Sequence, residues 1–231
     1  MSLDSYIASL NLPFAVTESQ LLNGLACAST FTMFYTIWPG SSYKQKVEKE
    51  AGQVVEMPPG KQGELVTVAH TIGLFAPALI FLIGLPMNKF VMPNWLQRYS
   101  IPPAPSPEIY YGARVAGYIG SLGIGITMDW GMRHLSTQWH IVGLRERPKL
   151  VNTGPFAYIR HPMYLCGMFL DLFAAAMYWN WMPLAGAALA ITSFIIKIPM
   201  EEEVILKNKK IGEAYKRYQK DVPYRVIPYI W

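Results

Sequence analysis

The chain has 231 residues, of which 52% are hydrophobic and only 15% are charged. Soluble domains carry about 25% charged residues, so this composition is typical of a membrane protein and argues against a soluble enzyme. The net charge of +5 fits basic loops that face anionic lipid headgroups, and no interleaved basic and aromatic surface indicates nucleic-acid binding.

Five apolar runs approach or reach the length of about 20 residues that a helix needs to cross a bilayer. They are Leu21–Trp38, Leu65–Leu85, Ile109–Trp130, Tyr164–Trp181 and Met182–Ile198. The last two adjoin near Asn180 and Pro183, which predicts a tight helical hairpin. One long buried helix is the alternative, but about 35 apolar residues are too many for a single crossing. We therefore expect an all-α polytopic membrane protein with about five transmembrane helices.

The connections between the first runs have distinct patterns. Residues 42–62 are polar and are expected to be helical at first and then broken by Pro58 and Pro59. Residues 94–107 contain four prolines and are expected to be extended. The third run contains glycines at three- and four-residue spacing, which allow close helix contact, so this helix should be central in the bundle.

The distribution of lysine and arginine predicts the orientation in the membrane. With five crossings, seventeen of the twenty Lys and Arg residues fall on the side that holds residues 39–64, 131–163 and the C-terminal segment. Basic loops stay in the cytosol, so the C-terminus is predicted to be cytosolic and the N-terminus lumenal. We expect an internal membrane, the endoplasmic reticulum.

Beyond Glu203 the chain becomes polar, and apolar residues recur there at near-helical spacing. This pattern predicts an amphipathic cytosolic helix that ends near Asp221, because Pro223 cannot continue it.

Two polar clusters flank the predicted hairpin. In GPFAYIRHPMYLCG, His161 precedes Pro162 and should lie just before a helix whose free N–H groups face a cytosolic cavity. In KIPMEEE, Lys197 and Glu201 are four residues apart and can pair on one helix face. The simple interpretation of the first cluster is a capping turn at the membrane interface. That of the second is a solvated salt bridge between Lys197 and Glu201, with Glu202 solvated as well.

Other chemistry receives little support. Asp171, inside the fourth run, faces either the bundle interior or a ligand, and the sequence leaves both open. No metal-ligand spacing, glycine-rich phosphate loop or serine–histidine–acid elbow appears in the sequence.

At this point the sequence resembles the isoprenylcysteine carboxyl methyltransferase and phospholipid methyltransferase superfamily. The resemblance covers residues 140–231 and is carried by WHIV, KLVNTGPFAYIRHPMYLCG, KIPMEEE and GEAYKRYQKDVPYRVIP. The chain is expected to form one membrane domain over residues 1–231, with N-terminal helices in 1–138, and the resemblance implies a catalytic hairpin and tail in 139–231. It also implies S-adenosylmethionine as the cofactor and a lipid or a prenylated protein or peptide as the substrate that enters from the bilayer.

The resemblance implies site residues as well. Those expected to bind the cofactor are His140, Pro148, Lys149, Leu150, Val151, Phe156, His161, Tyr164 and Glu201. Glu201 would hold the cofactor's ammonium group. Lys197 and Arg225 are the catalytic candidates, because a carboxylate substrate needs only a cation to orient it. Lys197 stands where the family has arginine, and Phe156 where it usually has tyrosine, which leaves the methyl acceptor open.

The function predicted is O-methylation of a C-terminal S-isoprenylcysteine carboxylate. A phospholipid N-methyltransferase is the first alternative. The tail VPYRVIPYIW is also similar to the end of membrane sterol reductases, which implies an NADPH-dependent reductase as a second alternative. A catalytically inactive membrane scaffold is the third.

Overall fold

The protein is described by a computed structural model that covers residues 5, 7, 16–37, 43–58, 60–139 and 143–231. The described chain is mostly helical, as predicted, although one two-stranded sheet corrects the all-α expectation. Two helices, α4 (Gln62–Met87) and α8 (Met182–Lys207), are long and apolar enough to cross a membrane. The apolar helix α7 (Pro162–Tyr178) is shorter.

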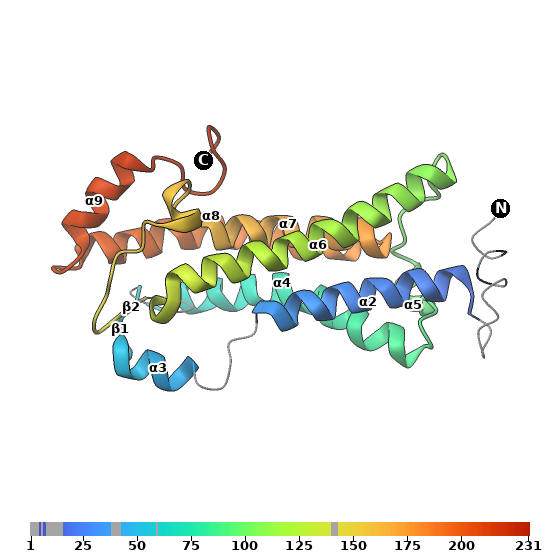
Figure 1. Cartoon of the computed structure of the whole chain (residues 1–231), viewed down its shortest axis with the longest axis horizontal. Coiled ribbons are helices and arrows are strands. Elements are labelled where there is room, and N and C mark those ends of the chain that lie inside the picture. Colours follow the sequence, from blue (N-terminus) through green and yellow to red (C-terminus); the bar gives the residue numbers. More distant parts are fainter. Residues whose placement is uncertain (1–4, 6, 8–15, 38–42, 59, 140–142) are drawn as a thin grey trace.

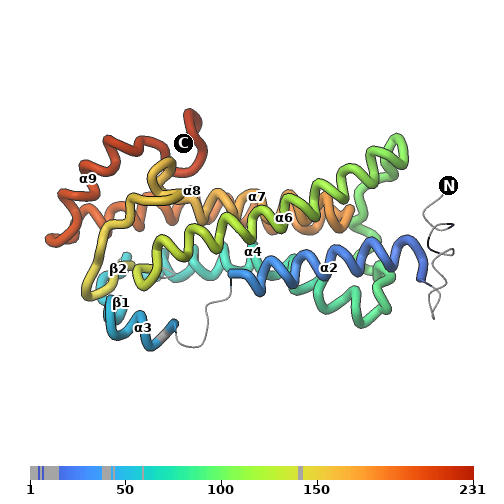
Figure 2. Tube along the Cα trace, in the orientation of Figure 1, coloured from blue at the N-terminus to red at the C-terminus, as the bar shows by residue number. Residues whose placement is uncertain are grey.

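The five predicted apolar runs all form helices. The first and third runs are α2 (Glu18–Ile37) and α6 (Pro107–Leu135), and the others are α4, α7 and α8. Figure 1 shows these helices lying side by side along the long axis of the molecule. Figure 2 traces the chain through the same helices in sequence order. The helix ends differ from the predicted runs by a few residues, and the largest difference is at α8, which continues past Ile198 to Lys207, so the acidic cluster lies within the helix.

Glycines in α6 allow the close helix contacts that the sequence predicted. A Cβ atom on Gly117 would lie 2.6 Å from the backbone nitrogen of Met177 on α7. Gly120 on α6 lies against the ring of Phe173 on α7, and Gly125 on α6 faces α2. Helix α6 therefore packs against α7 and α2 through positions that leave no room for a larger side chain.

Helices α4 and α8 approach each other in the same way. A Cβ atom on Gly73 would lie 2.8 Å from the carbonyl oxygen of Gly186. Asp171 on α7 is 1% exposed, and its Oδ2 would lie 3.2 Å from a Cβ atom on Gly186. Asp171 thus faces the bundle interior, where its Oδ2 has no hydrogen-bond partner among the described residues.

The predicted hairpin joins α7 to α8 at Asn180. Trp179 ends α7 in the left-handed conformation, with φ of 52°. The buried Asn180 side chain donates to the Leu96 carbonyl (3.0 Å) and accepts from the Met182 backbone N–H (2.9 Å). Leu96 belongs to the short helix α5 (Asn94–Gln97), so the proline-rich connector is only partly extended.

The polar segments gather at the opposite end of the bundle. They form α3 (Tyr43–Glu50), β1 (Val54–Glu56), η1 (Ser136–Gln138), β2 (Leu144–Arg145), η2 (Gly154–Ala157) and α9 (Gly212–Asp221). Strands β1 and β2 pair antiparallel. Helix α9 ends at Asp221 as predicted, and it lies at this end together with α3 and the sheet (Figure 1).

Candidate functional site

The Arg-His-Pro turn is held in place by the C-terminal tail. His161 occupies the N-cap position of α7 with φ of −127°, and Pro162 follows it in the first turn, as predicted. The backbone N–H of Arg160 donates to the Tyr224 carbonyl (3.0 Å), and that of His161 donates to the Arg225 carbonyl (2.8 Å). The tail therefore runs beside the start of α7 and brings Arg225 to the site.

Glu202 is the centre of a buried charged cluster, which we call the Glu202 cluster. Its Oε1 accepts hydrogen bonds from Arg160 Nε (2.8 Å) and the Tyr215 hydroxyl (3.2 Å). His161 Nε2 lies 3.2 Å from the same oxygen, and Arg225 Nε donates to Oε2 (2.9 Å). Glu202 is only 2% exposed, so the expectation that it would be solvated is wrong.

The helical spacing of α8 contains the signal that would have placed Glu202 correctly. Phe194 and Ile198, both 0% exposed, precede it by eight and four residues, so the three share one helix face. Glu203 lies outside that stripe and its side chain is 63% exposed. A run of three glutamates looks uniformly solvated unless it is aligned with the apolar stripe before it.

Positive charge exceeds negative charge in the Glu202 cluster. The Arg160 guanidinium also donates through one Nη to the carbonyls of Val222 and Pro223, at 2.7 Å each. A buried charge is stable only when it is paired and its hydrogen bonds are satisfied, so Arg160 ties α8 to the tail. Arg225 shares the same carboxylate, but its side chain is 34% exposed. Of the two guanidinium groups, that of Arg225 is thus the one that an anionic ligand can reach.

Glu201 belongs to a second group, which we call the Glu201 chain. The Tyr164 hydroxyl on α7 donates to Glu201 Oε1 (2.7 Å), and Lys197 Nζ lies 3.6 Å from the same oxygen. Lys197 is 2% exposed, and its Nζ lies 3.4 Å from His70 Nδ1 on α4. The chain therefore links α7, α8 and α4.

His70 was missed by sequence reasoning, although the sequence carries a signal for it. It lies on the same face of α4 as the buried residues Val66, Gly73 and Pro77, at spacings of three or four residues. An ionisable residue within a buried stripe of an apolar helix indicates a specific partner. Here the partner is Lys197.

The two groups are neighbours on the same end of the molecule. Consecutive residues on a helix point about 100° apart, so Glu201 and Glu202 reach different partners. The rings of His161 and Tyr164, with centroids 5.6 Å apart, connect the two groups along the first turn of α7. Predicted site residues that the structure brings together are His161, Tyr164, Lys197, Glu201 and Arg225. Their assigned roles stay predictions.

The predicted cofactor residues upstream form a less compact group. Pro148, Lys149, Leu150 and Val151 lie in the segment between β2 and η2. Leu150 packs against Tyr215 and Tyr218 of α9, whereas Lys149 is exposed. His140, the remaining predicted ligand, lies outside the described residues.

Phe156 is buried at the η2 segment, and its backbone is held by α9. Its carbonyl oxygen accepts a hydrogen bond from the Tyr218 hydroxyl. Burial raises the pKa of Tyr218 to about 12, so this hydroxyl keeps its proton at neutral pH. Phe156 thus contributes an apolar ring and a fixed backbone rather than the polar group of the usual tyrosine.

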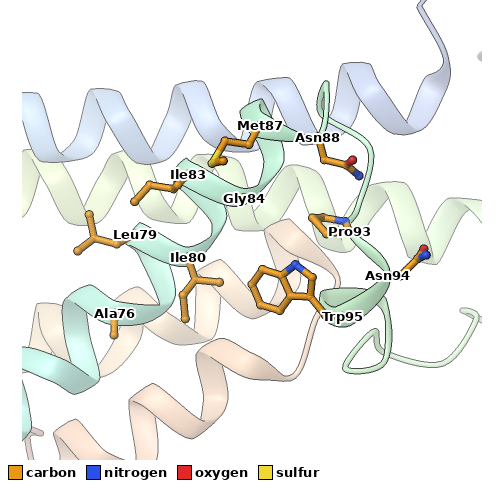
Figure 3. A pocket seen from close by; sticks show the side chains of 10 residues that line it. All are labelled: Ala76, Leu79, Ile80, Ile83, Gly84, Met87, Asn88, Pro93, Asn94 and Trp95. Carbon is orange, nitrogen blue, oxygen red and sulfur yellow. The ribbon is translucent and has the colours of Figure 1, made fainter.

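An apolar groove lies at the other end of the bundle. It has a volume of about 830 Å³ and is bounded by the last half of α4 and by α5 (Figure 3). Its lining residues are Ala76, Leu79, Ile80, Ile83, Gly84, Met87, Asn88, Pro93, Asn94 and Trp95. This lining suits a lipid tail and offers no acid, base or cation for methyl transfer, so the polar end remains the candidate site.

Residues 121–207 match the model of the isoprenylcysteine carboxyl methyltransferase family. The match covers less than half of the chain and includes the Arg-His-Pro turn and both glutamates, but it excludes α4, α9 and the tail. No curated protein sequence matches the chain. The resemblance is thus confirmed for residues 140–207 of the 140–231 over which it was stated: this part is similar to the isoprenylcysteine carboxyl methyltransferase family, a family of membrane methyltransferases.

Proposed function

We propose that the protein transfers a methyl group from S-adenosylmethionine to the α-carboxylate of a C-terminal S-prenylated cysteine. One observation carries the proposal: the family segment places its Arg-His-Pro turn and both glutamates at one end of the bundle. Cations and carboxylates gather there in the number that a charged cofactor and a charged substrate require.

The chemistry of the groups at this end fits the proposed cofactor. S-adenosylmethionine carries an ammonium group, a carboxylate and a positively charged sulfur. Glu201, whose side chain is 13% exposed, supplies an anion for the ammonium group, and the Tyr164 ring supplies a π face for a cation. The residues proposed to line the remainder are His140, Pro148, Lys149, Leu150, Val151, Phe156 and His161. When bound, S-adenosylmethionine supplies a methyl group that an acceptor oxygen takes as the carbon–sulfur bond breaks.

A carboxylate acceptor suits the protein groups better than an amine acceptor. A carboxylate is already anionic, so Lys197 and Arg225 need only orient it toward the methyl group. An amine must first lose a proton to a neutral base. Of the residues proposed to line the site, only His140 and His161 could supply that base.

The proposal includes a membrane arrangement. We infer that α2, α4, α6, α7 and α8 all cross the bilayer of the endoplasmic reticulum, with the N-terminus lumenal and the C-terminus cytosolic. The positions of seventeen of the twenty Lys and Arg residues support this orientation. The chain then forms one membrane domain, with helices in residues 1–138 and the catalytic hairpin and tail in 139–231. A prenylated substrate reaches the site from the surrounding lipids.

A ligand titration followed by an activity assay tests the proposal. S-adenosylmethionine and its demethylated product should raise the thermal stability of the purified protein, because each binds the folded state. Labelled S-adenosylmethionine should then methylate an N-acetylated S-farnesylcysteine but not its carboxamide. Stabilisation by NADPH alone would instead indicate a reductase. Methylation of phosphatidylethanolamine alone would replace the acceptor, and no response to any ligand would favour a scaffold.

A further inference from the structure

His70 is a buried titratable residue on α4, a helix that lies outside the family match. Its Nδ1 lies 3.4 Å from Lys197 Nζ, and its ring packs 5.6 Å from the Phe194 ring, measured between centroids. The imidazole is 9% exposed. A residue on a different helix thus contacts the cation proposed to orient the acceptor.

The contact with Lys197 gives His70 a hydrogen-bonding role. An ammonium group only donates hydrogen bonds, so His70 Nδ1 is the acceptor in a hydrogen bond from Lys197 Nζ. Lys197 also lies 3.6 Å from Glu201 Oε1 and 5.6 Å from the centre of the Tyr164 ring. The flexible lysine side chain is therefore held on several sides.

Lysine needs such contacts more than arginine does. The arginine guanidinium is a rigid planar fork, whereas the lysine ammonium is a point charge on four rotatable bonds. The proposed cofactor adds a reason, because its ammonium group would compete with Lys197 for Glu201. His70 is then one of the contacts that keep Lys197 Nζ in place.

We propose that His70 is a positioning residue that holds the Lys197 ammonium for the acceptor carboxylate. The inference rests on the proposed function, since it assumes a carboxylate acceptor. To hold Lys197, the residue at position 70 needs a hydrogen-bond acceptor where Nδ1 lies, and the size of the ring is not important. Asparagine places an amide oxygen near the position of Nδ1, whereas glutamine places its polar atoms near Nε2.

The experiment compares His70→Asn, His70→Gln and His70→Leu with the parent, using S-farnesylcysteine as the acceptor. His70→Leu and His70→Gln should raise KM for the acceptor about tenfold, as expected when one hydrogen bond that positions the lysine is lost. His70→Asn should stay within about threefold of the parent, and the Kd for S-adenosylmethionine should be unchanged in all three. The control is Thr71→Val, which alters an exposed hydroxyl on the same helix.

The outcomes separate this inference from the proposed function. A parent protein that binds S-adenosylmethionine but methylates no carboxylate refutes the proposed function. An active parent with the same acceptor KM in His70→Gln and His70→Asn refutes the role of His70 alone. If His70→Leu does not fold, the His70→Asn and His70→Gln variants still test the role of His70. An equal rise in the acceptor KM of both would indicate that His70 acts only through packing.

Discussion

Glu201 and Glu202 are adjacent in the chain but lie in different environments. The Glu202 side chain is 3% exposed and is enclosed by groups from the turn before α7, from α9 and from the tail. The Glu201 side chain is 13% exposed, with Tyr164 and Lys197 beside it. The two neighbouring carboxylates therefore differ in exposure and in partners. The proposed function adds the hypothesis that Glu202 supports the fold while Glu201 binds the cofactor.

Glu202→Gln should have the largest effect on stability. The substitution keeps the shape but leaves Arg160 and Arg225 without their shared counter-ion. Removing one partner of a buried ion pair costs about 3–5 kcal/mol, so the free energy of unfolding should fall by that amount. Reversible unfolding in mixed micelles measures it. The control is Glu203→Gln, whose exposed pair with Lys207 should matter by less than about 0.5 kcal/mol. Equal stability of the two variants would contradict a structural role for Glu202.

Glu201→Gln should mainly weaken the binding of S-adenosylmethionine. A hydrogen bond to a charged group contributes about 1.5–3 kcal/mol, which corresponds to an increase in Kd of about 10- to 100-fold. Isothermal titration calorimetry of the parent and the variant measures the change, while the thermal midpoint of the ligand-free protein should fall by less than in Glu202→Gln, whose carboxylate is more enclosed. Unchanged affinity would remove Glu201 from the cofactor site.

Removing one tyrosine hydroxyl from each group gives a matched comparison of smaller size. Tyr215→Phe deletes a donor to Glu202 and should lower the free energy of unfolding by about 1 kcal/mol without changing cofactor affinity. Tyr164→Phe deletes the donor to Glu201 and should weaken cofactor binding by about three- to tenfold. Both variants are measured in the two assays above. The same pattern of effects in both would show that the two glutamates do not differ in role.

Tyr218→Phe should lower the free energy of unfolding at neutral pH by about 1 kcal/mol, as Tyr215→Phe does, because one hydrogen bond is lost. Burial raises the pKa of Tyr218 to about 12, whereas the pKa of a tyrosine in an unfolded chain is about 10. The protonated form is favoured in the folded state, so its contribution is complete below about pH 10 and is lost as the pH rises through about 12. The parent should therefore lose stability over that range more steeply than the variant. Tyr229→Phe, at a residue that is 90% exposed, is the control.

Local patterns were sufficient to predict much of the fold. The five apolar runs, the hairpin at Asn180 and the end of α9 at Asp221 follow from hydrophobic period and from residues that cannot continue a helix. The glycine spacing of α6 likewise predicted its close contacts. Local patterns did not predict the two-stranded sheet. Strands β1 and β2 are short, and they pair only because loops that are distant in the sequence converge.

For the site, the sequence by itself determined which residue types flank the hairpin, including the Arg-His-Pro turn and the acidic cluster of α8. Only the tertiary structure decided which groups enclose Glu202, and that His70 on α4 lies beside Lys197. The physical reason is that helical period determines which face of a helix is buried, while the partner of that face depends on how separate helices pack. A charged side chain becomes structural or ligand-binding through that partner.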